Sequence, residues 1–407
     1  MKSSIRSGSV IGGMLLIGGS CIGAGMLALP IITGLCGFIP SIVLFLISWA
    51  FMTTTALLVL EINGQFSKQV NFVSMVGKSL GSIGRFLSWF LYLFLFCSLL
   101  VAYVSGSGSI ASSFIEAVTS FHLSTFVSSL FFVIVFGFVV YLGTKAVDIF
   151  NRFLMVGLIL AYVGVLFFGV FKVDFANLSH IDIRYSLFPL PILITSFGFH
   201  NMIPSLTAYM NGDIEKMRKV IIGGSLITLG IYLLWNAVVL GVVPLEGKMG
   251  LKASYFSGKE ASQVVKAFFE GTWVGAFVQA FAFFAIVTSF LAQALGLMHF
   301  LADGFKLSLA KKNTWWLTIL AILPPAIFAW IYPAVFYKSL SFAGGFCAVV
   351  LFGIFPALMV WLSRYHQKIA SKYRVFGGKK TLALAMLYAL FIFVLEFLKL
   401  FEPLAKS

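Results

Sequence analysis

The chain has 407 residues, of which 60% are hydrophobic and only 10% are charged, and its mean hydropathy is +1.05. This composition lies far outside the range of soluble globular proteins and predicts a membrane protein. The net charge of +15 would also suit a nucleic-acid-binding protein. The basic residues lie in the short segments between apolar runs, however, which argues against nucleic acid as a partner.

Apolar segments long enough to cross a bilayer core of about 30 Å recur along the whole chain. We predict an all-α integral membrane protein with eleven transmembrane helices, and one transmembrane domain over residues 1–407. The predicted spans cover residues 10–34, 39–62, 86–114, 124–144, 150–171, 186–209, 219–243, 273–302, 315–333, 338–362 and 381–401.

Most of the 28 Lys and Arg residues share one side of the membrane if the N-terminus is cytoplasmic. Positive charge concentrates on the cytoplasmic side of membrane proteins, so we predict that orientation. An odd number of spans then places the C-terminus outside. The basic residues on the predicted cytoplasmic side are Lys2, Arg6, Lys68, Lys78, Arg85, Lys145, Arg152, Lys216, Arg218, Lys219, Lys306, Lys311, Lys312, Arg364, Lys368, Lys372, Arg374, Lys379 and Lys380.

The first predicted span is interrupted at its centre by GGSCIGAGMLALP, from Gly18 to Pro30. A helix in hydrocarbon must bond all its backbone groups internally, and glycines followed by proline weaken that ladder. We expect a second half-helix to begin here with unpaired N–H groups, which suit a carboxylate. The alternative is that these glycines only allow close helix packing. The expected site residues are Ser20, Gly23, Ala24 and Gly25.

The sixth predicted span is interrupted in the same way by SFGFHNMIP, from Ser196 to Pro204. Unwinding here would free backbone carbonyls, which suit an ammonium group. The two breaks together match the backbone of a zwitterionic amino acid. The phenylalanine side chains could gate the site, stack on a substrate ring, or simply pack. The expected site residues are Ser196, Phe197, Gly198, Phe199, His200 and Asn201.

Spans 1–5 and 6–10 follow the same order, and each set begins with an interrupted helix. Because five is an odd number, the second set must be inverted relative to the first. We therefore predict a 5+5 inverted repeat with discontinuous helices 1 and 6. Repeat one covers about residues 10–171, repeat two about 186–362, and residues 381–401 form an extra peripheral helix.

Four side chains are candidates for ion coupling. His200 is an ionisable group near the predicted bilayer centre, so it either carries a proton or stays neutral in one structural hydrogen bond. Glu61, near the inner end of the second span, either carries a proton or pairs with Lys68. Thr288 and Ser289 in span 8 either offer oxygens to sodium or bond to their own helix. The spacing of the four cysteines indicates neither a disulfide framework nor a zinc site, and we expect no metal.

The segments GGSCIGAGMLALP and TSFGFHNMIPSLTAYMNGD resemble the span 1 and span 6 signatures of the hydroxy/aromatic amino acid permeases, especially the tyrosine- and tryptophan-specific bacterial transporters. The resemblance extends over nearly the whole chain. It implies the LeuT-like fold of the amino acid–polyamine–organocation superfamily. It also implies proton-driven uptake of an aromatic amino acid across the bacterial inner membrane, so the outer side on which we predict the C-terminus is the periplasm. The matching positions are Gly23 to Gly25 and Ser196 to Asn201, although Asn201 replaces a smaller residue, often glycine.

We therefore expect a secondary active transporter that imports tyrosine, or tryptophan, by proton symport and without a cofactor. Spans 1, 2, 6 and 7 would rock against spans 3, 4, 8 and 9. Sodium coupling remains the alternative within this class. An enzyme is disfavoured because no carboxylate pair, metal cluster or nucleophile–base pair lies near a span end, and a channel because there is no filter loop or charge ring. The candidate partners of a substrate hydroxyl are Tyr103, which we include in the site, and Tyr92, Ser105 and Asn236.

Overall fold

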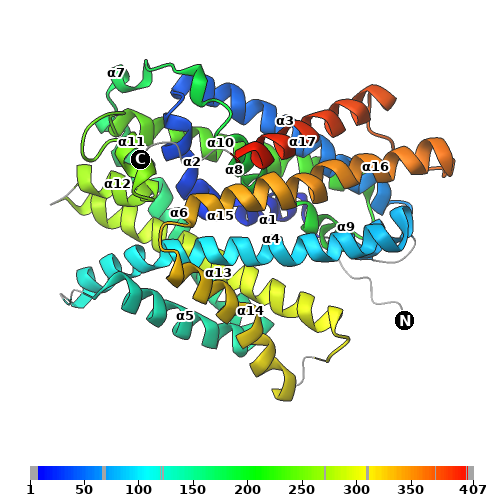
Figure 1. Ribbon diagram of the computed structural model, residues 1–407, viewed down its shortest axis with the longest axis horizontal. Coiled ribbons are helices and arrows are strands. Elements are labelled where there is room, and N and C mark those ends of the chain that lie inside the picture. The colour runs from blue at the N-terminus through cyan, green and yellow to red at the C-terminus, as the bar shows by residue number, and fades with distance from the viewer. Residues whose placement is uncertain are drawn as a thin grey trace.

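The computed structural model describes residues 8–66, 70–119, 121, 123–269, 272–308, 311–371, 373–399 and 401. Within these residues all regular secondary structure is helical (Figure 1). Lys2, Arg6, Lys68 and Lys372, which belong to the predicted cytoplasmic set, lie outside them.

The helices follow one another along the chain with short connections. Their bounds are α1 (Val10–Cys21), α2 (Ala24–Gly34), α3 (Phe38–Asn63), α4 (Phe72–Thr119), α5 (Thr125–Tyr141), α6 (Thr144–Gly169), α7 (Phe175–Leu178), α8 (Leu190–Ser196), α9 (Ile203–Tyr209), α10 (Ile214–Val242), α11 (Leu251–Phe256), α12 (Ala261–Phe268), α13 (Trp273–Gly304), α14 (Lys311–Ile331), α15 (Phe336–Phe342), α16 (Phe355–Trp361) and α17 (Gly378–Lys399). Wider, π-helical turns over Ala343–Ile354 join α15 to α16, and a second such stretch, Leu362–His366, follows α16.

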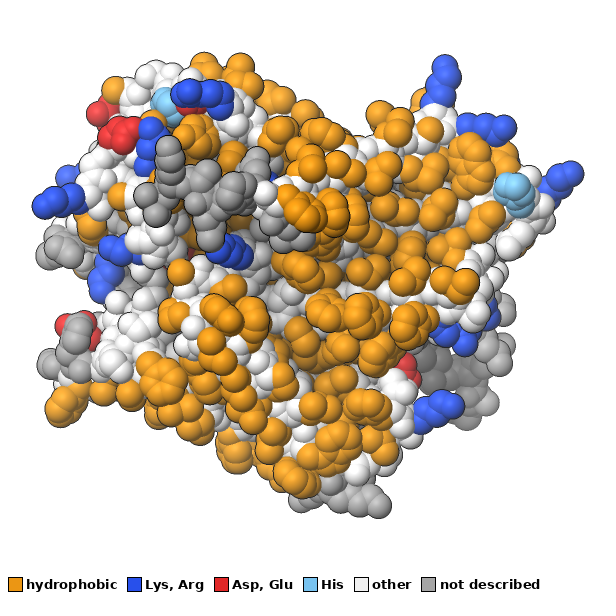
Figure 2. Space-filling view, viewed as in Figure 1, with side chains coloured by type: hydrophobic (Ala, Val, Ile, Leu, Met, Phe, Trp, Pro, Cys, Tyr) orange, Lys and Arg blue, Asp and Glu red, His pale blue; other side chains and the backbone are white. Residues whose placement is uncertain are grey.

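Eight of the described helices are long and apolar enough to cross a membrane, and the number is nine if α1 and α2 form one bent span. The angle between α1 and α2 is 61°. Figure 2 shows the corresponding surface, where a broad hydrophobic band separates Lys and Arg side chains at the two ends of the molecule. The chain is a multi-pass membrane protein.

Besides the span formed by α1 and α2, two of the eleven predicted spans do not form single long helices. The predicted span 124–144 contains α5, which has only 17 residues. The predicted span 186–209 is divided into α8 and α9, of seven residues each, because six residues between them leave the regular helix. In the predicted span 86–114 the helix begins earlier, at Phe72, and α4 bends at Gly81, whose φ of 75° favours glycine.

The long helices form two groups on either side of α4 (Figure 1). In one group, α1 and α3 pack on α10, and α2 packs on α8 and α10. In the other, α13 packs on α4, α6 and α14, and α5 packs on α4 and α14. The last helix, α17, packs mainly on the π-helical stretch and α16. Thus α10 joins α1, α2 and α3 into one group, and α4 joins α5, α13 and α14 into the other.

The broken helix α1–α2 lies at the centre of the molecule. Every residue of α2 is buried, whereas only 22% of the apolar window of α6 is buried. An apolar helix that leaves most of its surface exposed faces lipid, and one buried on all sides lies in the core. The first interruption is thus enclosed by protein, where non-helical backbone is tolerated.

Candidate substrate site

The break between α1 and α2 leaves donors unpaired, as the sequence predicts. Gly23 has an extended backbone (φ −168°, ψ −148°), and α2 begins at the next residue. Within the described residues, the N–H groups of Gly23, Ala24 and Gly25 donate to no protein group. Three unpaired donors at the start of a buried half-helix favour an anionic group.

The break between α8 and α9 is less open than expected. The N–H of Phe199 donates to the carbonyl of Phe197 at 3.2 Å, and the N–H of Met202 donates to the carbonyl of Phe199 at 3.0 Å. Of the carbonyls of Phe197, Gly198 and Phe199, only that of Gly198 accepts no hydrogen bond from the described residues. The unwound segment therefore folds into short turns that satisfy two of its three acceptors.

The two breaks lie against each other. A Cβ atom built on Gly25 would lie only 3.0 Å from the Cβ atom of Ser196 and still closer to its hydroxyl oxygen. The hydroxyl of Ser196 itself donates to the carbonyl of Ile192 at 2.7 Å. Glycine at position 25 is therefore what lets the start of α2 approach the end of α8.

Tyr232 of α10 connects the two breaks. Its hydroxyl oxygen lies 2.6 Å from the carbonyl oxygen of Cys21 and 2.8 Å from that of Ser196, the last residues of α1 and α8. Its ring lies 5.2 Å from the ring of Phe197 in an edge-to-face arrangement. Tyr232 is absent from the predicted site, because no motif distinguishes it from other tyrosines in apolar spans.

The predicted residues Tyr103 and Ser289 lie beside the first break. The hydroxyl of Ser289 donates to the carbonyl of Ile22 at 3.2 Å. A Cβ atom built on Gly23 would lie 2.5 Å from the hydroxyl oxygen of Ser289 and 3.3 Å from that of Tyr103. Thr288 is separate from this group, since its hydroxyl bonds to its own helix at Phe284, at 2.8 Å.

His200 is fully buried next to the second break. Its Nε2 lies 2.9 Å from the hydroxyl oxygen of Thr55 in α3, and its ring stacks on Phe352 at 4.8 Å. Its Nδ1 is buried and has no hydrogen-bond partner within the described residues. A buried imidazole with one unpartnered nitrogen has a position ready for a proton, a water or a substrate group.

The remaining predicted residues divide by burial. Phe197 and Phe199 are fully buried. Ser20 and Asn201 are exposed, and the hydroxyl of Ser20 donates to the carbonyl of Ile17 at 2.8 Å. The buried residues therefore surround the point where the two breaks meet, whereas Ser20 and Asn201 point away from it.

The other candidate partners of a substrate hydroxyl differ in whether their side chains already have a hydrogen-bond partner. The side chain of Asn236 is bonded to the hydroxyls of Thr33 at 2.8 Å and Ser41 at 2.9 Å. The hydroxyl of Ser105 donates to the carbonyl of Pro333. The hydroxyl of Tyr92, in contrast, is buried and has no partner within the part of the chain that is described. Tyr92 and Tyr103 thus remain as candidates.

Glu61 lies in a buried ion pair far from the breaks along α3. Its carboxylate accepts hydrogen bonds from Nε and Nη2 of Arg364 at 2.6 and 2.5 Å, and from the N–H of Val375 at 2.8 Å. The side chain of Glu61 is 0% exposed and that of Arg364 is 6% exposed. Lys68, the partner considered from the sequence, lies outside the described residues. The described His, Cys, Asp and Glu side chains form no group of three that could hold a metal ion.

Comparison with known proteins identifies the family. A model of the tryptophan/tyrosine permease family matches residues 6–396. The chain belongs to this family. As a tryptophan/tyrosine permease it is a transporter and not an enzyme, which confirms the expected family and class.

Several relatives of this permease have names that state a substrate. The tyrosine-specific transport system 2 of Haemophilus influenzae is 33% identical over 391 residues, which cover 95% of this chain and 96% of the relative. The tryptophan-specific transport protein of the same organism is 31% identical, with 95% and 94% covered. The low affinity tryptophan permease of Escherichia coli is 28% identical, with 98% and 97% covered. Similar identity to tyrosine and tryptophan transporters leaves the preference between them open.

The fold of this permease is shared with a solved structure. The crystal structure of MhsT in complex with L-phenylalanine superposes with a TM-score of 0.66 and covers 96% of this chain and 98% of that one. Sequence identity is 14%, so the similarity is one of fold alone.

Proposed function

We propose that this permease imports an aromatic amino acid, tyrosine or tryptophan, by proton symport across the bacterial inner membrane. The observation that carries the proposal is the pair of buried helix breaks joined by Tyr232, with three unpaired N–H groups at the start of α2. The names of the relatives supply the class of substrate.

The substrate carboxylate binds to the N–H groups of Gly23, Ala24 and Gly25. The ammonium group lies opposite, at the carbonyl of Gly198, which accepts no other hydrogen bond from the described residues. The aromatic side chain contributes most of the binding energy, because burying a ring of about 150–250 Å² at about 25 cal/mol/Å² is worth roughly 4–6 kcal/mol before other costs.

The architecture we propose has eleven spans. The bent pair α1–α2 is the first, α5 is the fourth, and α8 with α9 forms the sixth. Spans 1–5 and 6–10 form the 5+5 inverted repeat, and α17 is the extra helix. The N-terminus is cytoplasmic and the C-terminus periplasmic, which agrees with the distribution of Lys and Arg along the chain.

Substrate moves by alternating access, and the packing of the two half-helices supports this mechanism. α2 packs on α4, α8, α10, α12 and α13. α1 packs chiefly on α10 and, within the described residues, has no comparable packing on α4 or α13. The path is thus closed on the side of α2 and less tightly packed on the side of α1, as expected for a transporter that faces the cytoplasm.

His200 is the proton carrier in this proposal. It lies at the second break and keeps one ring nitrogen unpartnered, so a proton bound there changes the charge next to the substrate. Glu61 is a poorer candidate, because its carboxylate already neutralises Arg364. Sodium coupling, with Ser289 as a ligand next to the carbonyl of Ile22, is the alternative.

Uptake of labelled tyrosine and tryptophan into proteoliposomes tests the proposal. We expect saturable uptake that an inward proton gradient drives against the concentration gradient, and that a sodium gradient does not drive. The His200→Gln variant should bind and exchange substrate but lose accumulation driven by the pH gradient. The control is His299→Gln, since His299 lies on α13 and bonds to Thr144 at 3.3 Å.

Three results would count against the proposal. Uptake indifferent to an imposed pH gradient would exclude proton coupling, and normal accumulation by His200→Gln would remove His200 from that role. If the wild-type protein shows no substrate counterflow, a channel is favoured over a transporter. Competition by each of the twenty amino acids against labelled tyrosine then defines the preferred side chain.

A further inference from the structure

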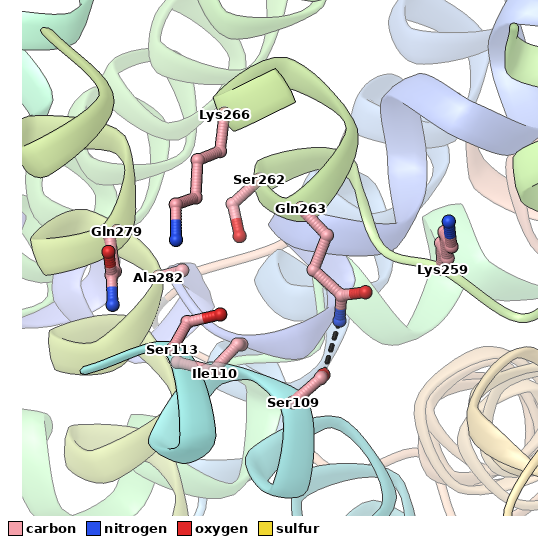
Figure 3. A pocket seen from close by; sticks show the side chains of 9 residues that line it. All are labelled: Ser109, Ile110, Ser113, Lys259, Ser262, Gln263, Lys266, Gln279 and Ala282. Carbon is pink, nitrogen blue, oxygen red and sulfur yellow. Dashed lines mark hydrogen bonds between the residues drawn. The ribbon is translucent and has the colours of Figure 1, made fainter. Parts of the chain in front are cut away.

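A polar cavity lies at the end of the molecule where α2 is enclosed. Its volume is about 190 Å³, and it is bordered by the last turns of α4, the short helix α12 and the first half of α13. Figure 3 shows its side chains, with Lys266 reaching from α12 into the space next to Gln279 and Ser113. On the orientation proposed above, this cavity opens to the outside.

The free polar atoms of this outer cavity are mostly hydrogen-bond donors. Within the described residues, the ammonium groups of Lys259 and Lys266 form no ion pair. The side chain of Gln279 is only 8% exposed, and its Nε2 is buried without a hydrogen-bond partner. A buried amide nitrogen and a neighbouring ammonium group that find no acceptor among the described residues favour an anionic ligand.

Two of the other polar side chains of the cavity are already hydrogen-bonded, and Lys259 is exposed. The amide nitrogen of Gln263 donates to the hydroxyl of Ser109, as the dashed line in Figure 3 marks. The hydroxyl of Ser262 donates to the carboxylate of Glu260 at 2.6 Å. They shape the wall and leave Lys266 and Gln279 as the groups directed at a ligand.

The described side chains place no negative charge on the wall of the outer cavity. The described residues that line it include no carboxylate. Among the described residues, the acid next to the lining residues Lys259 and Ser262 is Glu260, which turns back to its own helix and accepts from the N–H groups of Ser262 at 2.7 Å and Gln263 at 2.9 Å. Burial raises the pKa of Glu260, although these hydrogen bonds oppose the shift, so its negative charge is disfavoured.

We propose that the outer cavity binds a small monovalent anion, with the ammonium of Lys266 and the amide N–H of Gln279 as its donors. Two sources share this chemistry: the carboxylate of an arriving amino acid, and dissolved chloride. The first source rests on the proposed transport function, whereas the second does not. Only Ile110 and Ala282 are apolar among the lining side chains, so the cavity is built for a charged group and not for an aromatic ring.

Thiol modification of the full-length Ser113→Cys protein in detergent tests this site without any need for transport. The rates with an anionic sulfonatoethyl and a cationic trimethylammoniumethyl methanethiosulfonate are compared with their rates toward a free thiol. An adjacent ammonium group should favour the anionic reagent by about tenfold at low salt. This preference should disappear in Ser113→Cys/Lys266→Gln and persist in Ser113→Cys/Lys248→Gln, which removes an exposed charge elsewhere in the same loop.

Protection experiments separate the two sources at constant ionic strength, with HEPES as the bulky reference anion. Slower modification of the thiol introduced by Ser113→Cys in chloride alone identifies an inorganic anion, and slower modification in acetate and tyrosine identifies a carboxylate. Replacing Gln279 with Leu should weaken either protection by about tenfold, since one buried hydrogen bond to a charged group is lost. The wild-type protein, whose four cysteines are buried or half-buried, provides the background rate.

Three outcomes would overturn the anion site. One is a reagent preference that Lys266→Gln leaves unchanged, and another is protection by none of the three solutes. The third is no reaction of the introduced thiol with either reagent, which would mean that the cavity is closed to solutes. None of these outcomes depends on uptake, so they are distinct from a failure of the proposed transport function.

Discussion

The hydroxyl of Tyr232 lies within hydrogen-bond distance of two carbonyl oxygens but has only one proton to donate. At any moment it satisfies either Cys21 at the end of α1 or Ser196 at the end of α8. The other carbonyl keeps a free lone pair next to the unpaired donors of α2. A single residue of α10 thus holds both half-helices in place and leaves one acceptor that a substrate ammonium group can use.

The Tyr232→Phe variant tests this role at the level of one atom. The ring keeps its packing against Phe197, but both carbonyls lose their donor, which costs about 1–3 kcal/mol when the groups stay buried. We expect the Michaelis constant for uptake to rise about tenfold and the maximal rate to change less, because the hydroxyl positions the backbone that binds the substrate.

The matched control for this variant is Tyr162→Phe. Tyr162 of α6 donates its hydroxyl to the carbonyl of Ile231 at 2.8 Å, away from both breaks. If the two variants lose the same fraction of activity, Tyr232 serves general stability and does not position the site.

At the scale of elements, the C-terminal end of α3 is held to the segment that follows α16. Glu61 bonds to Arg364 and to the N–H of Val375, and Tyr373 of the same segment lies 5.0 Å from the guanidinium of Arg218 in α10. A buried charge pair with additional backbone partners is costly to break from one side, by about 3–5 kcal/mol, because the remaining charge stays buried. This geometry predicts a structural role for Glu61.

We expect Glu61→Gln to lower the midpoint of thermal unfolding by several degrees, since Arg364 would then be buried without a counter-charge. The double variant Glu61→Gln/Arg364→Gln should recover part of this loss, because it leaves no unpaired charge. Thermal unfolding in detergent measures the stability, and uptake measures the coupling. If Glu61→Gln leaves the stability unchanged but abolishes the response of uptake to the pH gradient, Glu61 carries a proton and its role is not structural.

At the scale of the whole molecule, the apolar band of Figure 2 and the charged ends define how the protein sits in a bilayer. The two packed groups of helices meet along α4, and α2 of the first group also packs on α4 and α13. Since α2 packs on both groups and α1 chiefly on α10, relative motion of the groups would change access mainly on the side of α1.

The proposed orientation predicts from which side of the membrane an impermeant reagent reaches each loop. A cysteine in place of Lys248 should react with an impermeant maleimide in intact cells, because the loop after α10 is outside. A cysteine in place of Lys368, after α16, should react only in inverted membrane vesicles. Both lysines are exposed, so accessibility depends on the side and not on burial. The opposite labelling pattern would reverse the orientation.

The sequence by itself determined the class of protein, the helical membrane-spanning architecture and the location of both breaks. These features follow from local chemistry. An apolar run must be helical in hydrocarbon, and Gly23 or Gly198 weakens its own helix whatever the neighbouring helices are. For the same reason, the donor cluster at Gly23 to Gly25 was predictable from the chain alone. Family membership was predictable too, since the two interrupted motifs carry it.

Only the tertiary structure decided which side chains meet at the breaks. The contacts of Tyr232 with Cys21 and Ser196 join residues 211 and 36 positions apart, and the Glu61–Arg364 pair spans 303 positions. No local pattern encodes such pairings, because they depend on how helices pack against one another. The structure likewise separated Ser289 from Thr288, since adjacent residues on a helix point about 100° apart and only one of them faces the break.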